Sequence, residues 1–385
     1  MVATSIENNL LTYRGSNFLK QRLVLSTLSG KAVRITDIRS SDTDPGLRGY
    51  EISLIRLLDK ITNGTKIEIN QSGTSLYYRP GLLDGGVIQH NCSVERGIGY
   101  YLDALIALGP FSKVPLNATL KGVTSSKESP SVDYIKSSAL QTLKKFLVVD
   151  DGLELKIKQR GLMPLGGGEV IFKCPVRKNI RAIQFDNPGM VKRIRGTVYA
   201  SKVSPAFANR TIEAAKGVLL NFIPDIYLYS DQTKGKQAGN SPGFGVNLVA
   251  ETTNGVFYST DVTSNVVTKG ENPSIPEDVG TSAAHKLLEE IYRGGCVDSS
   301  FQWLVALFMA LSSKDVSKFL VGPYTAYTIS FLQHLREFFS ITFKLDNPKR
   351  EHDDEDNDDD YLPGAKKVLM TCIGIGYVNM NKRTN

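Results

Sequence analysis

The residues with the clearest chemical potential are an arginine and three consecutive glycines in the segment Arg160–Val170, which reads RGLMPLGGGEV. The guanidinium of Arg160 is a fixed, bidentate donor for a phosphate or a carboxylate. Gly166, Gly167 and Gly168 give the backbone access to positive φ, which allows a phosphate or another strand to approach closely. The same residues also suit a tight corner between two strands that binds nothing. From the residue types alone, an anion site and a structural corner are equally supported.

A second candidate site is a basic segment on either side of residue 185. Within this window its members face a single acid, Asp186, and they are Lys173, Arg177, Lys178, Arg181, Lys192, Arg193 and Arg195. On adjacent antiparallel strands, alternate members would project to one side and bind phosphates, and Arg48 and Arg160 would contribute if their loops converge. The alternative is a solvated strand face. A functional patch would bind an acidic protein or the RNA backbone, and since it lacks interleaved aromatic residues it would not read single-stranded bases.

The pattern R-G-x-x-P-x-G-G-G-x-V over residues 160–170 resembles the signature of the RNA 3′-terminal phosphate cyclase family. Further blocks that resemble this family, over roughly residues 12–345, are Leu25–Ile35, Asp44–Glu51, Pro130–Ile135, Pro276–Gly280 and Leu287–Ile291. The resemblance implies three units, each of two helices and a four-stranded sheet, packed about a pseudo-threefold axis. It also implies a smaller inserted domain.

The residue that the active enzymes of this family need for catalysis is replaced in this chain. The resemblance implies a nucleophilic histidine that takes AMP from ATP, and Ser300 stands at the corresponding position within Cys296–Leu304. A serine hydroxyl without an adjacent base is a weak nucleophile. The positions downstream are also changed, to Trp303 and Leu304. We therefore expect no adenylyl transfer, no cofactor and no metal site.

The loops that would hold a nucleotide also depart from the family pattern. The glycine-rich N-terminal loop is reduced to Gly15–Arg22, and Asn91–Gly97 takes the place of a second small-residue turn. We expect Phe18, Glu95 and Arg96 to crowd or repel a triphosphate. The four histidines, which we interpret as structural or solvated, are His90, His285, His334 and His352. The chain therefore resembles the non-cyclising branch of the family.

Composition indicates a folded protein with a basic body. The chain has 385 residues, of which 41% are apolar, and this length allows two domains with a substantial core. Neither a signal peptide nor a membrane span is recognisable, and four scattered cysteines favour reduced thiols. Residues 351–360 contain eight acids, so removing them from the net charge of +7 leaves +15. We interpret the segment 347–362 as a disordered, solvated loop, or as one that competes with RNA or binds a basic partner.

These residues must be positioned by an α/β (α+β) fold with a large domain at 1–184 and 273–385 and an insert domain at 185–272. Apolar periodicity and turn signals predict helices at 18–29, 46–62, 95–108, 132–147, 298–312 and 324–339. Strands are expected at 66–69, 74–79, 153–158, 169–174 and 340–345. Within the insert we expect strands at 191–199, 245–251 and 256–259, a helix at 206–222 and a mobile loop at 230–243.

Three functional hypotheses follow. The resemblance implies a catalytically silent scaffold for small-subunit ribosome biogenesis, acting in 18S pre-rRNA processing at early cleavage sites, in the nucleolus of the nucleus. Its partners would be pre-rRNA, the small-subunit processome and a large ribosome-assembly GTPase, with no membrane. The second hypothesis is an endonuclease that cuts the first internal spacer of the pre-rRNA, with Lys314, Asp315 and Lys318 as candidates. One carboxylate is a poor substitute for a two-metal site, and a helix-end turn explains the same residues. The third, an active cyclase, is disfavoured by Ser300.

Overall fold

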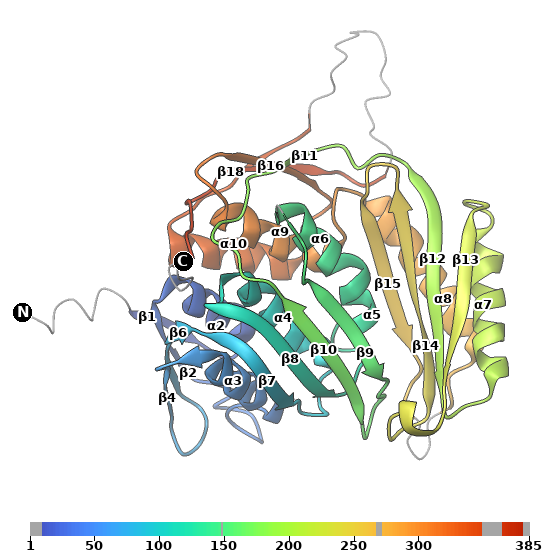
Figure 1. The fold of residues 1–385 in the computed structure, drawn as a ribbon, viewed down its shortest axis with the longest axis horizontal. Helices are drawn as coiled ribbons and strands as arrows, with labels where there is room; N and C mark the ends of the chain where they lie inside the picture. Colours follow the sequence, from blue (N-terminus) through green and yellow to red (C-terminus); the bar gives the residue numbers. More distant parts are fainter. Residues whose placement is uncertain (1–9, 148, 267–271, 349–363, 380–385) are drawn as a thin grey trace, which may run out of the picture.

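The structure is a computed structural model that describes residues 10–147, 149–266, 272–348 and 364–379. The acidic run 351–360, most of the expected loop 347–362 and His352 lie outside these ranges. The described chain forms three four-stranded sheets with associated helices, and a fourth four-stranded sheet in the insert (Figure 1). In the part of the chain that is described, no helix is both long and apolar enough to span a membrane.

The three sheets of the large body share one topology, which confirms the expected repetition. In each, the first two strands are parallel and the last two pair antiparallel. The first sheet is ordered β1 (Leu10–Arg14), β2 (Ala32–Thr36), β5 (Leu76–Arg79), β4 (Lys66–Ile69). The second is ordered β7 (Gly85–Asn91), β8 (Val114–Gly122), β10 (Gly168–Cys174), β9 (Glu154–Gln159). The third is ordered β11 (Gln184–Phe185), β16 (Val316–Val321), β18 (Val368–Ile373), β17 (Lys344–Asp346). Two short strands, β3 (Thr62–Asn63) and β6 (Leu82–Leu83), pair separately.

The third sheet contains the largest departure from the expected elements. Its first strand, β11, precedes the insert, so the insert interrupts this unit. Its strand β18 follows the acidic run and pairs with both β16 and β17. Neither β16 nor β18 was expected from the sequence. The strand expected at 340–345 is confined to Lys344–Asp346, because Ser340 adopts a left-handed conformation at the end of the preceding helix.

Two helical segments per unit form the interior of the large body. They are α2 (Leu19–Ser29) and α3 (Gly49–Ile61), α4 (Ile98–Leu108) and the continuous run α5 (Val132–Tyr134), η2 (Ile135–Ala139) and α6 (Leu140–Phe146), then α9 (Gln302–Leu311) and α10 (Ala326–Phe339). Every residue of α9 is buried, as expected for a helix that is apolar on all sides. Helix α2 packs against α4 and α10, and α6 packs against α9, so the three units meet through their helices. The four cysteines are buried and free, as expected.

The insert is a sheet covered on one face by two helices. Its strands are ordered β13 (Ile226–Thr233), β12 (Val191–Ser201), β14 (Gly243–Thr252), β15 (Phe257–Thr263). Helix α7 (Pro205–Leu219) begins with Ser204 as its N-cap, and α8 (Pro276–Arg293) packs beside it and on β14 and β15. The helices approach closely because Gly280 leaves room for the carbonyl of Thr211. Thus α8, although it follows residue 272, lies on the insert sheet (Figure 1). The loop expected at 230–243 begins later, because β13 continues to Thr233.

Candidate functional site

A central cavity of about 560 Å³ lies where the helices of the three units meet. Residues at or next to the N-terminal ends of α2, α3, α4, η4 (Ser299–Phe301) and α10 contribute to it. Helix N-termini carry partial positive charge, so their convergence is a property of an anion site. Its lining residues are Ser16, Asn17, Phe18, Leu19, Lys20, Arg39, Tyr50, Glu51, Arg96, Tyr100, Asp103, Glu128, Pro130, Ser299, Ser300, Trp303, Thr325 and Tyr327. The fold therefore brings the reduced N-terminal loop and Ser300 into one hollow.

Ser300 is half-buried, and its hydroxyl accepts a hydrogen bond of 2.9 Å from the hydroxyl of Tyr134. Two positions earlier, Asp298 caps the 3₁₀ turn η4 by accepting from the Phe301 amide, and it also accepts from the Ser138 hydroxyl. Burial raises the pKa of Asp298 to about 8. An aspartate at the N-cap position is a common signal for the start of a helix, and Asp298 could have predicted this turn from the sequence. Within the described ranges the hydrogen-bond partner of the Ser300 hydroxyl is Tyr134, which is not a base, so this hydroxyl lacks the group that would activate it.

None of the three histidines within the described ranges lines the central cavity. His90 is buried, and its Nε2 lies 2.9 Å from the hydroxyl of Ser53. His334 is buried beside Gln21 and Arg22. Burial lowers the pKa of both His90 and His334 to about 4, so each is neutral near pH 7. His285 is exposed on α8. The interpretation of these three as structural or solvated agrees with their positions.

Aromatic side chains occupy much of the cavity wall. Phe18, at the N-cap of α2 with φ 58°, packs its ring against Tyr327 at a centroid distance of 6.0 Å. Arg96 lies over the ring of Tyr50 at 4.8 Å and donates to the carbonyl of Glu128. Phe18 and Arg96 line the hollow, and their effect on a triphosphate stays a prediction. Glu95 does not line it, because its carboxylate accepts from the Tyr50 amide at the start of α3.

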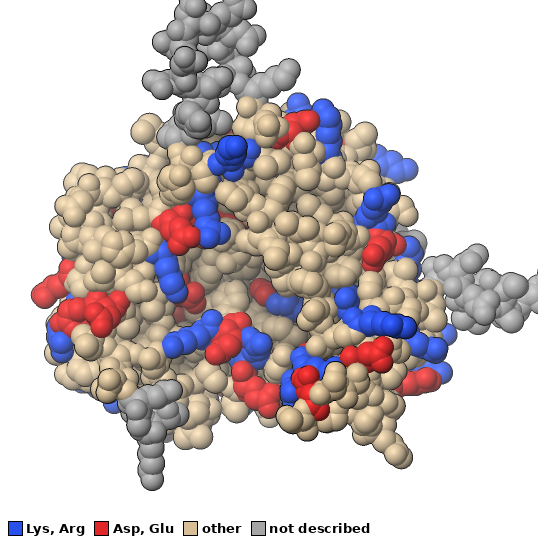
Figure 2. Space-filling model, turned by 180° about the vertical axis from the view of Figure 1, so that it is seen from behind, with Lys and Arg blue, Asp and Glu red and all other residues tan. Residues whose placement is uncertain are grey.

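The charges of the cavity are largely satisfied within the fold. Lys20 and Asp103 form an ion pair of 2.5 Å with both side chains nearly buried. Burial acts to lower the pKa of Lys20, but the Asp103 carboxylate outweighs this and raises it. Arg39 donates two hydrogen bonds of 2.8 Å to the Glu51 carboxylate. The lining contains as many acidic as basic residues, so the wall offers no excess positive charge to a triphosphate. Figure 2 shows acidic and basic side chains similarly interleaved around a hollow on the back of the molecule.

The glycines of the 160–170 segment form a corner against the insert and do not line the central cavity. Gly166 and Gly167 have φ of 62° and 82°, and a side chain at Gly167 would collide with that of Asn240. The Asn240 amide donates to the carbonyl of Gly166 at 2.9 Å. Gly168 approaches Thr124 too closely for a Cβ. These contacts are those expected of a structural corner between two strands.

Arg160 is the most enclosed of the expected anion-binding residues. Its guanidinium forms two hydrogen bonds to Asp133, of 2.6 and 3.2 Å, and one of 2.7 Å to Asp231. It also lies 4.7 Å from the centre of the Tyr199 ring. Burial acts to lower its pKa, but the two carboxylates raise it well above its ordinary value. Arg160 therefore joins β13 of the insert to α5 of the large body, and three of its five N–H groups already donate to carboxylates.

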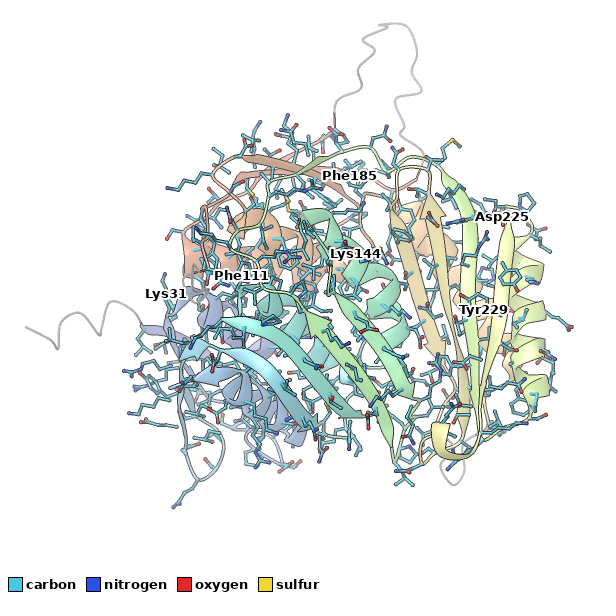
Figure 3. The ribbon with its side chains drawn as sticks, viewed as in Figure 1. Lys31, Phe111, Lys144, Phe185, Asp225 and Tyr229 are labelled. Carbon is cyan, nitrogen blue, oxygen red and sulfur yellow. The ribbon has the colours of Figure 1, made fainter. Side chains whose placement is uncertain are left out.

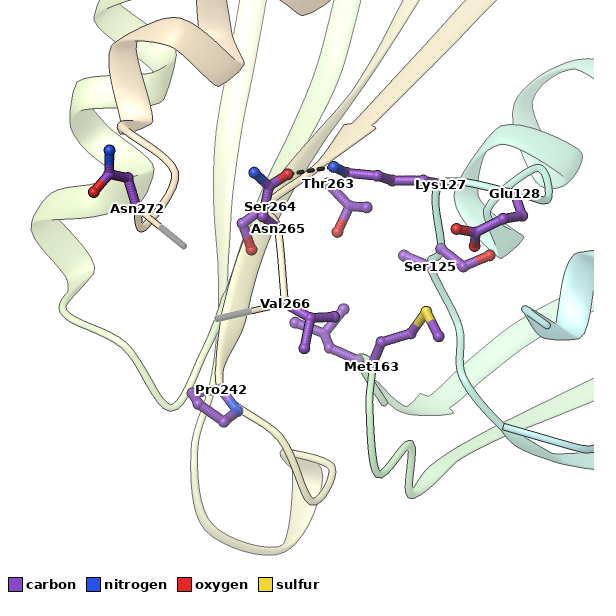
Figure 4. Close-up of a pocket in the computed structure, with 12 residues that line it drawn as sticks. Ser125, Lys127, Glu128, Met163, Pro242, Thr263, Ser264, Asn265, Val266 and Asn272 are labelled. Atoms are coloured by element: carbon purple, nitrogen blue, oxygen red, sulfur yellow. Dashed lines mark hydrogen bonds between the residues drawn. The ribbon is translucent and has the colours of Figure 1, made fainter. Parts of the chain in front are cut away.

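A second, interdomain cavity of about 530 Å³ lies between the large body and the insert (Figure 4). Leu162 and Met163 of the glycine segment line it from one side, and the end of β15 lines it from the other. The Lys127 ammonium donates to the Asn265 side chain across it. Glu128 lines both cavities, so the loop 125–130 separates them.

The basic segment does not form one patch on adjacent strands, and that expectation is wrong. Lys173 lies on β10 of the second sheet, whereas Lys192, Arg193 and Arg195 lie on β12 of the insert sheet. Most residues of the basic segment already form ion pairs, and the acids of these pairs lie outside residues 173–195. The pairs are Lys173–Glu154, Lys192–Glu251, Arg193–Glu251 and Arg195–Asp225. Arg177 and Arg181 donate to the carbonyls of Val149 and Lys145.

Arg48 and the nuclease candidates do not line the central cavity. Arg48 is paired with Asp44 and lies 3.7 Å from Asp42. Lys314 and Asp315 are exposed in the turn between α9 and β16, at the opposite end of α9 from Ser300. The ten residues of α9 alone span about 15 Å. The Asp315 carboxylate accepts a hydrogen bond from the backbone amide of Val316, and Lys318 lies within β16. Over the ranges that the structure describes, no group of three or more potential metal ligands occurs.

Comparison with known proteins gives consistent matches along the chain. A family model described as RNA 3′-terminal phosphate cyclase matches residues 11–345. The chain is 67% identical over 379 residues to a "Probable RNA 3′-terminal phosphate cyclase-like protein" of Drosophila melanogaster, covering 98% of each. It is 55% identical to the "RNA 3′-terminal phosphate cyclase-like protein" of Homo sapiens, covering 97% of each. It is 42% identical to "rRNA processing protein rcl1" of Schizosaccharomyces pombe, covering 97% of this chain and 98% of that protein.

Proposed function

The chain belongs to the RNA 3′-terminal phosphate cyclase family, and on that premise we propose that it is a catalytically silent member that acts in rRNA processing. It binds RNA and protein partners during small-subunit ribosome assembly and does not transfer AMP. Its similarity to a protein named for rRNA processing supports the process. The basic charge of the chain supports an RNA-containing partner.

The observation that carries the catalytic part of the proposal is the environment of Ser300. This residue lies in the central cavity, and the family resemblance implies a nucleophilic histidine at its position. Its hydroxyl accepts from Tyr134 and has no histidine beside it among the cavity-lining residues. Adenylyl transfer needs a nucleophile that can attack phosphorus near neutral pH and then release the phosphoryl group, and a serine hydroxyl in this setting does neither.

The charge balance of the cavity supports the same conclusion independently. A triphosphate needs cations or free backbone amides to offset its charge. Lys20 and Arg39 are each neutralised by a carboxylate, and Arg96 contacts a tyrosine ring and a carbonyl. An ATP molecule would have to break these contacts in order to bind.

We place this function in the small-subunit processome, at the early cleavages of the 18S precursor. The nucleolus is the corresponding location, and a large ribosome-assembly GTPase is the proposed protein partner. Affinity purification of the tagged chain from nuclei should recover this GTPase together with small-subunit pre-rRNA. Recovery of neither, while a nucleolar marker protein of the same assembly is enriched, would contradict the proposed partners.

The catalytic part is tested by incubating the purified chain with [α-³²P]ATP and Mg²⁺ and resolving the protein by denaturing electrophoresis. We expect no covalent label in the parent chain or in Ser300→Ala, with an active cyclase of the family as the positive control. A covalent AMP adduct on the parent chain overturns the proposal.

A cellular version of this test separates scaffold from enzyme. Depletion of the protein should cause unprocessed 18S precursors to accumulate, and Ser300→Ala should restore processing because no step depends on that hydroxyl. Failure of Ser300→Ala to restore processing, at normal protein abundance, would indicate chemistry at this position. Site-specific RNA cutting that is lost in Asp315→Ala but kept in Ser300→Ala would instead favour the endonuclease hypothesis.

A further inference from the structure

The insert sheet has one face covered by helices and a second face that is only half covered. Alternate residues of β13 and β14, such as Leu228 and Leu248, are buried toward α7 and α8. On the second face, the end nearer the large body is buried by Arg160, which contacts Tyr199 and Asp231. The other half of this face is not covered by any described element, as the exposure of its residues shows.

Two tyrosines project from the uncovered half. Tyr227 is 61% exposed and Tyr229 is 48% exposed, and both lie on β13, the edge strand of the sheet. They are two residues apart on a strand, so their side chains project from the same face. Their ring centroids are 5.6 Å apart with planes inclined by 48°. Figure 3 shows Tyr229 on β13, with Asp225 just before the strand. Two large rings in solvent on a rigid strand are not explained by packing.

The parallel neighbour β12 places polar and basic side chains directly beside these rings. Arg195 is in register with Tyr227, and Thr197 is in register with Tyr229. We call Arg195, Thr197, Tyr227 and Tyr229 the stacking face. One of the residues adjacent to it is Arg193, which shares the carboxylate of Glu251 with Lys192. Arg195 pairs with Asp225 at the exposed surface. The three cations Lys192, Arg193 and Arg195 are therefore paired with only two carboxylates, those of Glu251 and Asp225. This leaves a small excess of positive charge.

We propose that the stacking face binds single-stranded RNA, with successive bases stacked on Tyr227 and Tyr229. Exposed aromatic rings on a sheet, beside arginines and hydroxyls, are the chemistry by which proteins bind unpaired bases. The arginines of β12 lie where the backbone of such a strand would pass, and an exposed ion pair such as Arg195–Asp225 yields readily to a phosphate. An apolar peptide segment would need a pocket for its anchors, and neither the central cavity nor the interdomain cavity includes these tyrosines.

This inference deepens the proposed RNA-binding function by naming the RNA class and the residues. It does not depend on the absence of adenylyl transfer, because the stacking face and the central cavity share no residues. A covalent AMP adduct would contradict the proposed silence and leave the stacking face intact. Failure of the tyrosine variants to alter RNA binding would remove the stacking face and leave the silence untouched.

The test is fluorescence anisotropy of the full chain with a 5′-labelled U₁₂ RNA, comparing the parent with the double variant Tyr227→Ala/Tyr229→Ala. Each base–aromatic stack is worth about tenfold in affinity, so the double variant should bind about a hundredfold more weakly. The pair Tyr227→Phe/Tyr229→Phe keeps both rings and should stay within about twofold of the parent.

The matched control is Tyr292→Ala. Tyr292 is 62% exposed on α8, which covers the opposite face of the sheet, and its loss should leave the affinity unchanged. All variants should unfold at the parent's midpoint, since they alter exposed rings. The proposal is overturned if U₁₂ does not bind the parent, or if the alanine pair binds it as well as the parent does. Retained RNA affinity combined with loss of a co-purifying protein in the alanine pair would assign this face to a polypeptide.

Discussion

The central cavity and the stacking face contain the same kinds of side chain, tyrosines beside basic residues, yet they differ in what those side chains already contact. In the cavity, Lys20 and Arg39 are each paired with a carboxylate, and Tyr100 is partly buried. On the stacking face, Tyr227 and Tyr229 are open to solvent and Arg195 has only an exposed partner. Residue types alone do not identify a binding site, because a group that is neutralised inside the fold must lose its partner before it can bind anything else.

The strongest test of the underlying principle, that buried partners hold a charge more firmly than exposed ones, compares Arg160 with Arg195. Arg160→Ala removes the cation that neutralises Asp133 and Asp231 in a largely buried setting, and we expect a loss of about 3 kcal/mol in the free energy of unfolding. Arg195→Ala breaks an exposed pair and should cost less than about 1 kcal/mol. Urea denaturation measures both. Equal costs would show that burial does not separate these two ion pairs.

The pH dependence of stability tests the same difference with carboxylates. The folded-state pKa of Asp298 is raised to about 8 by burial, above its unfolded value near 4, so the folded state holds the extra proton between these pH values. Stability from this group is therefore present at low pH and is lost as pH rises toward 8. Between pH 5 and 8, the free energy of unfolding should fall in the parent by on the order of 3 kcal/mol more than in Asp298→Asn, because the amide does not titrate.

The matched control for Asp298 is Asp225. Its carboxyl is exposed beside Arg195, whose hydrogen bond lowers the pKa of Asp225. Asp225→Asn should therefore leave the pH profile between 5 and 8 parallel to that of the parent, because this carboxyl is ionised throughout. A flattened profile in Asp225→Asn, or an unchanged one in Asp298→Asn, would contradict the assignment of the decline to buried Asp298.

A smaller effect is expected at the glycine corner. Gly167→Ala combines a positive φ with a collision against Asn240, and we expect a loss of about 2 kcal/mol. Gly255→Ala has a similar φ of 72° but open space around it, so it should cost only the backbone strain of about 1 kcal/mol. Thermal unfolding of both variants measures the difference. Equal costs would mean that the contact between the corner and the insert carries no energy.

The smallest effect is expected at Asp315. Asp315→Ala removes one local hydrogen bond in an exposed turn and should change the free energy of unfolding by no more than about 0.5 kcal/mol. Under the scaffold proposal, processing of the 18S precursor should also remain normal in cells that carry this variant. Northern analysis of the precursors would reveal a cleavage defect, and such a defect at normal stability would favour the endonuclease hypothesis.

The amino-acid sequence determined the helices of the three units and the family resemblance, because both depend on local patterns. Apolar periodicity located the helices of all three units within a few residues, and the segment Arg160–Val170 with Ser300 identified the family pattern and its missing histidine. Strand β18 was not predicted, because it follows the acidic run 351–360 and is separated from its partner β16 by about fifty residues. Nothing in its neighbourhood along the chain indicates a pairing over that distance.

Only the tertiary structure decided which charged and aromatic groups remain available. Arg160 meets Asp231 across 71 positions, and Tyr134 meets Ser300 across 166. The single aromatic residue within the sequence window 173–195 is Phe185, whereas strand pairing in the folded sheet places Tyr227, from a distant segment, beside Arg195. Local sequence fixes backbone conformation through short-range sterics and periodicity, whereas contacts between distant segments depend on how whole sheets and helices pack.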